Sequence, residues 1–267
     1  MREVQTAMAY QLLHVFKRLG IVPTNVIVVG AWDGGEVKDF LEAGVQMVYL
    51  FEAEPSAIKI LTKGYGGNPQ VKLFEGAVAS EAGQVKKFHI LNHGSSSLFA
   101  PNLDLLKKIL PDFQVNSEIQ VRTITLDDSL RDHYEQLSEN KLDTLLILDI
   151  QGGELEAIKG ASQLLKRVGW IQAEVSTTEL YQDQNTLAQL EAYLKEKGFR
   201  RVSTRIHPEI NHGDALYFRP DLISKSFLSA MRIEDFHWNL ARKRPAWIPS
   251  LSHSKIGRFV LKLIYGR

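Results

Sequence analysis

Several short runs of apolar residues constrain the fold of this chain more than any other feature of its sequence. The clearest are residues 26–29 (Val-Ile-Val-Val), 47–51 and 145–148, and none of them alternates with polar residues. A strand that is apolar at every position is typical of a parallel sheet covered on both faces. Segments with helical spacing, such as residues 36–43 and 153–166, lie between these runs. Strands that alternate with helices predict an α/β fold with a doubly wound, mostly parallel sheet.

Further strands extend the predicted sheet to an antiparallel edge. They are expected at residues 71–74, 85–91, 118–124, 170–175, 199–205 and 215–218. Residues His207 to Asp214 leave only a short loop between the last two of these strands. A connection this short joins antiparallel neighbours, because parallel strands need a crossover of a dozen or more residues.

The chain divides into three parts by pattern and by charge. Residues 1–24 carry apolar residues at helical spacing, residues 25–220 hold the predicted strands, and residues 221–267 form a basic appendage. The appendage has nine Lys or Arg and three acidic residues, a net charge of +6, whereas the whole chain has a net charge of +1. The rest of the chain therefore carries −5. Such a change in composition predicts a boundary near residue 220.

Composition narrows the class of protein. The 267 residues are 44% hydrophobic and 24% charged, which is ordinary for a globular protein and excludes a wholly disordered chain. The absence of cysteine excludes disulfides, Cys-ligated metal centres and Cys nucleophiles. We find no secretory signal, and no apolar stretch approaches the roughly 18 residues of a transmembrane helix. A cytoplasmic protein is the expectation.

The C-terminal appendage contains a basic amphipathic segment from Lys255 to Tyr265, with Phe259 and Leu263 on its apolar face. Packing on the main domain is the default expectation for such a segment. Three alternatives are peripheral contact with an anionic membrane, a cover over the acceptor site, and pairing in a dimer. Nucleic acid is not an expected partner, because basic and aromatic residues occur here without a recognised binding module.

Polar residues follow the predicted parallel strands at their carboxyl ends, where open α/β sheets bind ligands. In chain order they are Gly30 to Gly35, Glu52, Glu75 to Ala77, Asp149 and Glu174. His207 and His212 lie in the loop after the sixth strand, and we expect them at the same edge.

The first of these turns predicts a nucleoside-type cofactor. Glu52 lies 22 residues after Gly30, and an acid at about this distance can accept the ribose hydroxyls of a nucleoside. Trp32 replaces the second glycine of a dinucleotide fingerprint, and Asp33 places an anion beside the turn. Both features disfavour a pyrophosphate, and Asp33 suits a cation instead. The pattern therefore favours S-adenosylmethionine over NAD.

The ordered motifs resemble those of the FkbM family of S-adenosylmethionine-dependent methyltransferases, from about Val26 to Phe218. The matching segments are Val26 to Ala31 with Asp33-Gly34, Phe51-Glu52-Ala53-Glu54-Pro55, Ser95-Ser96-Ser97-Leu98, Val121 to Asp128, and Leu148-Asp149-Ile150-Gln151-Gly152-Gly153-Glu154 with Lys159-Gly160-Ala161. No single motif is decisive, but their order and spacing together are specific.

The resemblance implies a seven-stranded methyltransferase sheet and methyl transfer, commonly to a hydroxyl of a sugar, polyketide or other secondary metabolite. S-adenosylmethionine would be the cofactor and S-adenosylhomocysteine the product. The residues expected to contact the cofactor are Gly30, Ala31, Asp33, Gly34, Glu52, Ala53, Glu75, Ala77 and Asp149.

Three residues are candidates for the chemistry, which requires alignment of the reacting atoms and a base for the hydroxyl proton. Asp149 is the leading base, with helix capping as its structural alternative. Glu174 can bind the acceptor or, with Asp149, a divalent ion, although two carboxylates alone do not make a metal site. His212 is a candidate base because its pKa is ordinarily near neutrality. His207 and His93 are weaker candidates for the same role.

Two departures from the family pattern keep other functions open. Trp32 stands where Asn or His is common, and Gln151 stands where Glu is common. The loss of a carboxylate at Gln151 is compatible with a scaffold protein that keeps the fold without the chemistry. An NAD-dependent oxidoreductase is the less favoured alternative, because no Tyr/Lys hydride-transfer pair is recognisable. The sequence thus predicts an O-methyltransferase acting on a small-molecule or glycan acceptor.

Overall fold

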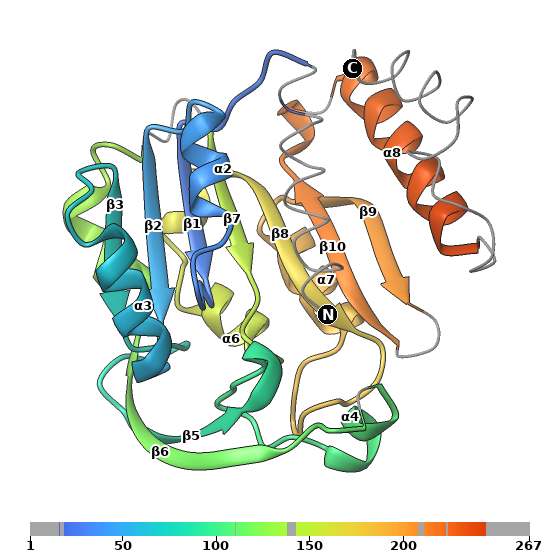
Figure 1. Ribbon diagram of the computed structural model, residues 1–267. Coiled ribbons are helices and arrows are strands. Elements are labelled where there is room, and N and C mark those ends of the chain that lie inside the picture. The colour runs from blue at the N-terminus through green and yellow to red at the C-terminus, as the bar shows by residue number, and fades with distance from the viewer. Residues whose placement is uncertain are drawn as a thin grey trace, which may run out of the picture.

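The computed structural model describes residues 16, 19–109, 111–137, 143–207, 211–222 and 224–243. Its centre is a seven-stranded sheet in the order β3-β2-β1-β7-β8-β10-β9. The strands are β1 (Asn25–Val29), β2 (Met47–Glu52), β3 (Val71–Glu75), β7 (Thr144–Leu148), β8 (Val168–Ser176), β9 (Arg200–His207) and β10 (His212–Phe218). Neighbours from β3 to β8 are parallel, and β10 is antiparallel to both β8 and β9. This confirms the predicted doubly wound, mostly parallel sheet with its antiparallel last strand (Figure 1).

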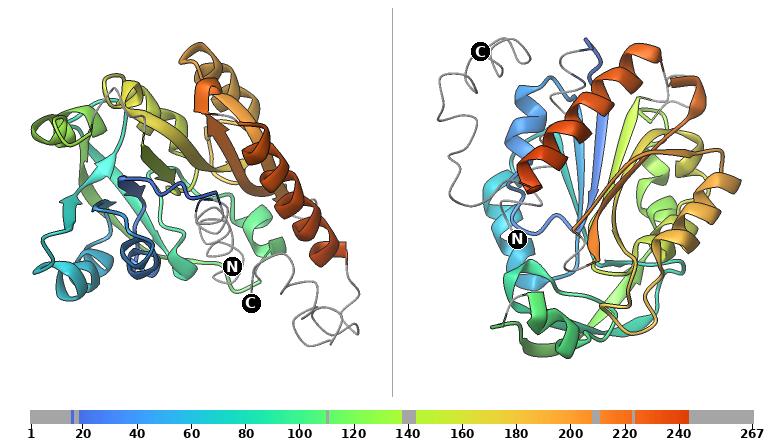
Figure 2. Two further views of the ribbon diagram at one scale, coloured as in Figure 1. Left: turned by 90° about the horizontal axis from the view of Figure 1, so that it is seen from above. Right: turned by 90° about the vertical axis from the view of Figure 1, so that its right-hand side faces the viewer.

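Alternate residues of each central strand face two separate cores. In β1, Ile27 and Val29 face one core while Val26 and Val28 face the other. The core around Ile27 is covered by α5 (Leu126–Leu130), α6 (Glu154–Lys159) and α7 (Leu187–Glu196). Helices α2 (Val37–Glu42), α3 (Pro55–Tyr65) and α8 (Lys225–Lys243) lie on the opposite face (Figure 2). Burial on both faces explains why these strands are apolar throughout.

Two of the predicted strands leave the main sheet and form a small one. β5 (Val85–Leu91) pairs antiparallel with β6 (Val115–Ile124), which also pairs in parallel with the short β4 (Ala77–Val78). This small sheet lies beyond the carboxyl ends of the main strands, next to α4 (Leu103–Ile109), at the bottom of Figure 1. It therefore encloses the edge at which ligands are expected.

The helix predicted at residues 153–166 is interrupted, which corrects the sequence interpretation. α6 ends at Lys159, and a separate 3₁₀ turn forms at Leu164–Lys166. The carboxylate of Asp127 accepts the backbone amides of Gln163 and Leu164, which begins the second turn. At the break, a Cβ on Gly160 would come within 2.3 Å of the carbonyl oxygen of Ala79. A contact from a distant segment therefore divides the helical pattern.

The two histidines assigned to a loop lie instead in paired strands. His207 ends β9, His212 begins β10, and the two are directly opposite in the ladder. The predicted loop was too long, because the pairing of β9 with β10 extends as far as His207 and His212. Both histidines are nevertheless at the expected carboxyl edge, since β10 runs antiparallel to β8.

The beginning of the C-terminal appendage packs on the main sheet. The ring of Phe227 in α8 lies 4.6 Å from that of Phe218, and the Arg205 guanidinium pairs with Asp235 at 2.9 Å. The amphipathic segment Lys255 to Tyr265 and most of the N-terminal stripe lie outside the described residues. In the described part of the chain, no helix combines the length and apolarity needed to span a bilayer.

Candidate active site

Two cavities meet at the carboxyl edge of the sheet. The first, called here the β2-side cavity, encloses about 50 Å³ between the ends of β1, β2 and β3 and the small sheet. The second, the β10-side cavity, encloses about 250 Å³ between the turn after β1, helix α2 and the ends of β7, β8 and β10. Four residues line both cavities: Gly30, Trp32, Gly94 and Asp149. A molecule in one cavity can therefore contact a molecule in the other beside Asp149.

Glu52 is the polar residue of the β2-side cavity that backbone groups hold in place. Its side chain accepts hydrogen bonds from the backbone amides of Trp32 at 2.7 Å, Ala53 at 2.7 Å and Glu54 at 2.8 Å. Burial raises the pKa of Glu52, and these three amides oppose that rise. A carboxylate has about four acceptor positions, so about one remains for a ribose hydroxyl in this arrangement.

The turn after β1 brings the backbone close to β2 and β7. Gly30 has φ of 86°, and a Cβ there would lie 1.9 Å from the carbonyl oxygen of Asp149. The next residue but one, Trp32, has φ of 47°, which is uncommon outside glycine. Its ring packs against Gly94, where a Cβ would come within 2.8 Å. Trp32 thus forms the wall between the two cavities.

The other predicted residues of the turn all lie on the β10 side. Ala31, Asp33 and Gly34 line the β10-side cavity and not the β2-side cavity. Asp33 accepts the backbone amide of Gly35 at 3.1 Å. They therefore lie on the other side of the junction from Glu52.

Of the residues predicted after β3, Ala77 lines the β2-side cavity and Glu75 does not. Glu75 is exposed at the end of β3. The chain turns at Gly76, whose φ of 145° only glycine adopts readily, and presents the backbone of Gly76 and Ala77 to the cavity. The Glu75 side chain thus lies outside the β2-side cavity, while Ala53 and Ala77 both lie on its wall.

The serine-rich segment closes one side of the same cavity. Ser96 lines it, and its hydroxyl donates to Glu54 at 2.8 Å. Ser97 donates instead to the backbone carbonyl of Gln151 at 2.8 Å, which ties the segment to the turn after β7. His93 pairs with Asp112 at 3.1 Å and does not line either cavity.

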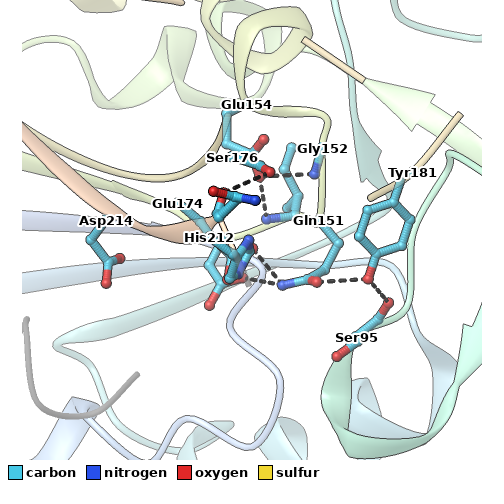
Figure 3. A network of polar contacts seen from close by, with 12 residues as sticks. Ser95, Gln151, Gly152, Glu154, Glu174, Ser176, Tyr181, His212 and Asp214 are labelled. Carbon is cyan, nitrogen blue, oxygen red and sulfur yellow. Dashed lines mark hydrogen bonds and ion pairs between the residues drawn. The ribbon is translucent and has the colours of Figure 1, made fainter. Parts of the chain in front are cut away.

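A buried network connects the three predicted catalytic residues, and Figure 3 shows the part around Gln151, Glu174 and His212. The Gln151 amide nitrogen lies 2.7 Å from Asp149 Oδ1 and 2.5 Å from Glu174 Oε2. On the other side of Glu174, His212 Nε2 lies 2.6 Å from Oε1. The Tyr181 hydroxyl lies 2.7 Å from the Gln151 amide oxygen, which fixes the orientation of the amide. Asp149, Glu174 and His212 therefore come together as predicted, with Gln151 between the two carboxylates.

The electrostatics of this network favour retention of a proton. Burial raises the pKa of Asp149 well above its ordinary value, and the nearby charge of Glu174 raises it further. Burial lowers the pKa of His212, which favours the neutral imidazole. Two adjacent carboxyl groups with these surroundings hold one proton between them. A pair in this state can accept a proton from a hydroxyl at the junction of the cavities.

Glu154 stabilises the turn that carries the network. Its carboxylate lies 3.1 Å from the amide of Ile150 and 3.2 Å from that of Gly152. Burial raises its pKa to about 7. Since Gln151 has φ of 57° in this turn, the two amide contacts help to hold a strained backbone.

Sequence analysis missed three polar residues of the β10-side cavity: Glu36, Gln172 and Asp214. Burial raises the pKa of Glu36 to about 8, and the carboxylates of Asp149 and Asp214 raise it further. The pKa of Asp214 is raised to about 7 by burial and by Asp149. The sequence offered one signal for Gln172, which is a polar residue inside the otherwise apolar strand β8.

Within the described residues, no group of three or more His, Cys, Asp or Glu side chains is arranged to hold a metal ion. The Gln151 amide nitrogen instead bonds to both Asp149 and Glu174.

Comparison with known proteins identifies related chains. The family model described as the methyltransferase FkbM domain matches residues 29–201. A curated relative, the 2-O-methyltransferase NoeI of Sinorhizobium fredii (strain NBRC 101917 / NGR234), is 28% identical over 172 residues, which are 61% of this chain and 68% of NoeI.

Solved structures of methyltransferases also resemble the chain, at lower similarity. The FkbM methyltransferase from Methylobacillus flagellatus KT has 15% identity and a TM-score of 0.44, with 73% of this chain and 43% of that chain covered. This chain thus spans less than half of that protein. The Burkholderia thailandensis 1,6-didemethyltoxoflavin-N1-methyltransferase, solved with S-adenosylhomocysteine, has 15% identity and a TM-score of 0.40, with 82% and 81% covered.

Proposed function

The protein belongs to the FkbM methyltransferase family, and from this premise we propose that it transfers a methyl group from S-adenosylmethionine to a hydroxyl of a sugar-containing or natural-product acceptor. The observation that carries the proposal is the meeting of the two cavities at Gly30, Trp32 and Asp149. A transferase for two substrates needs such a junction, because the reacting atoms must lie in contact and in line.

The β2-side cavity suits the adenosine part of S-adenosylmethionine. Its wall is apolar at Val78, Phe88 and Leu98, which gives a planar base flat surfaces to contact. Glu52 lies at the end of β2 with its remaining acceptor position available to a ribose hydroxyl. Bound there, the cofactor would supply a methyl group on a sulfonium, whose leaving group is a neutral thioether.

Asp149 and Glu174 would take up the acceptor proton. A base positioned within hydrogen-bond reach contributes about 10²- to 10⁴-fold, and it works best when its pKa approaches the working pH. Burial and mutual repulsion raise the pKa of Asp149 in that direction. His212 holds Glu174 from the side opposite Gln151, so the proton can be shared within the network.

Oxygen is the acceptor atom that we favour. The curated relative NoeI is named as a 2-O-methyltransferase, and a network with carboxylate bases suits a hydroxyl, which must lose its proton. Gln151 does not argue for an inactive scaffold, because its amide holds Asp149 and Glu174 together rather than leaving a gap.

Calorimetric titration with S-adenosylhomocysteine, with NAD as a parallel control, tests the proposal. We expect binding of S-adenosylhomocysteine alone, and labelled methyl transfer to hydroxylated acceptors. Tight binding of NAD, or no binding of S-adenosylhomocysteine, would contradict the proposed function.

A further inference from the structure

The β10-side cavity has an unusual balance of hydrogen-bonding groups. The side chains of Asp33, Glu36, Asp149 and Asp214 line it together with Gln172, and among the residues that the structure describes no Lys, Arg or His lines it. Such a wall offers many acceptors and few donors. The complementary ligand is one that brings donors or positive charge.

An unsatisfied buried atom points to the ligand more directly. Gln172 is only 5% exposed, and its amide oxygen has no hydrogen-bond partner in the described part of the structure. Its amide nitrogen faces Asp214 Oδ1 at 3.4 Å, which leaves the oxygen for the cavity that Gln172 lines. A buried acceptor without a partner costs about 1–3 kcal/mol of stability, so its retention suggests a partner in the bound state.

Three acceptors gather around this point from three different elements. Gln172 lies on β8, Asp214 on β10, and Glu36 immediately before α2. Glu36 and Asp214 both line this cavity, and the charge of Asp214 disfavours ionisation of the Glu36 carboxyl group. An ammonium group has three donors and a positive charge, whereas a hydroxyl has one donor and no charge. The set therefore matches a primary ammonium better than a hydroxyl.

We propose that the β10-side cavity binds a primary ammonium group of the methyl acceptor, beside Glu36, Gln172 and Asp214, so that the acceptor is an amino sugar or another amino alcohol. This inference rests on the proposed function and specifies its substrate class. The raised pKa values of Glu36 and Asp214 agree with it, because a bound cation would offset the repulsion that each carboxylate has from Asp149.

The position of Asp214 separates this site from the ammonium group of the cofactor itself. In the sheet order, β8 and β10 follow β7, so Asp214 lies two strand spacings, about 10 Å, beyond the strand that ends at Asp149. A cofactor whose sulfonium lay at the junction would place its short amino-acid tail beside Gly30 and Asp33, in the part of the β10-side cavity that the turn after β1 forms. The acceptor, on the far side of the reacting methyl group, extends toward Asp214.

Binding to the full-length protein saturated with S-adenosylhomocysteine tests the proposal. The probes are glucosamine, N-acetylglucosamine and glucose, which share a ring and differ in charge at one position. We expect glucosamine to bind at least about tenfold more tightly than the two neutral sugars, as the loss of a charge-assisted hydrogen bond predicts. Methyl transfer to the three sugars from labelled S-adenosylmethionine should show the same preference.

Variants assign the preference to named residues. Asp214→Asn and Gln172→Met should each reduce the preference for glucosamine about tenfold or more, while the affinity for S-adenosylhomocysteine stays within about threefold. Asp132→Asn is the matched control, because Asp132 is exposed and lines neither cavity. This control removes the same charge and should leave the preference unchanged.

The outcomes separate the two proposals. Binding of S-adenosylhomocysteine with equal or better binding of neutral sugars, or with no binding of glucosamine, overturns the ammonium site and leaves the proposed function standing. A loss of S-adenosylhomocysteine affinity in Asp214→Asn as large as the loss for glucosamine assigns the site to the cofactor tail and also overturns it. Failure of S-adenosylhomocysteine to bind the unmodified protein contradicts the proposed function itself.

Discussion

The two sides of the carboxyl edge treat buried carboxylates in opposite ways. On the β2 side, Glu52 receives three backbone amides that the turns after β1 and β2 supply. On the β10 side, Asp149 repels both Glu36 and Asp214, and this repulsion adds to burial in raising the pKa of each. Backbone amides satisfy the first carboxylate. The charges of His212 and Arg205 lower the pKa of Asp214 without cancelling the rise, which a bound cation would reduce further. The β2 side is thus preformed for the cofactor, whereas burial and repulsion disfavour the ionised carboxylates of the acceptor side.

Replacement of Asp149, which lines both cavities, should have the largest effect on turnover. Asp149→Asn keeps the shape but removes the base, so we expect kcat/KM to fall about 10³-fold. The affinity for S-adenosylhomocysteine, measured by calorimetry, should change by less than about threefold. Asp132→Asn, at an exposed position, is the control. Full turnover in Asp149→Asn would remove Asp149 from the mechanism.

On the β2 side, replacement of Glu52 should instead lower the affinity for S-adenosylhomocysteine and the free energy of unfolding. Glu52→Ala leaves three backbone amides without their acceptor, so we expect S-adenosylhomocysteine to bind about 100-fold more weakly. The free energy of unfolding, measured by urea denaturation, should fall by about 2–3 kcal/mol. Glu75→Ala is the matched control at the end of the next strand, where the carboxylate is exposed. If both variants lose the same affinity, the placement of the cofactor on Glu52 is wrong.

The amide between the two catalytic carboxylates offers a third test. Gln151→Glu places a third carboxylate against Asp149 and Glu174 without a donor between them. We expect turnover to fall about 30-fold and magnesium binding to become measurable by calorimetry, whereas we expect none for the unmodified protein. Gln151→Met should lose turnover without gaining magnesium binding. Unchanged activity in both variants would contradict the positioning role of Gln151.

The smallest expected effect is on the free energy of unfolding of the ligand-free protein and its dependence on pH. The pKa of Asp214 is raised to about 7 and that of Glu36 to about 8 in the folded protein, above their values of 3.8 and 4.5 in the unfolded chain. Their protonated forms therefore support folding at low pH, and this contribution is lost as the pH rises through about 7 and 8.

Asp214→Asn should remove part of this pH dependence. We expect it to raise the free energy of unfolding by roughly 2 kcal/mol at high pH and to change it little near pH 4, as measured by urea denaturation across the pH range. Destabilisation at high pH would mean that Asp214 is already compensated in the ligand-free protein.

The strands and the junction were predictable from local patterns. Apolar runs mark β1 and β7, and the rule that ligands bind at carboxyl ends places Gly30, Glu52 and Asp149 at one edge. These features need only the residues of one strand and the turn that follows it. The same rule places Asp149 and Glu174 at one edge, where His212 also lies at the start of β10.

Features that depend on distant segments were not predictable in this way. The break after α6 needs Asp127, which lies on a separate helix and caps the second turn. The exposure of Glu75 depends on the backbone turn at Gly76. The acidic β10-side cavity requires β10 to lie between β8 and β9, and no pattern within the sequence of β10 indicates this position.

A crystal structure of the protein with S-adenosylhomocysteine tests the division into two sides most directly. The account predicts adenine beside Gly76 and Ala77, a ribose hydroxyl on Glu52, and the sulfur at the junction facing Asp149. Asp214 and Gln172 should remain free of the ligand. Adenine in the β10-side cavity, or a sulfur atom away from Asp149, would contradict the division.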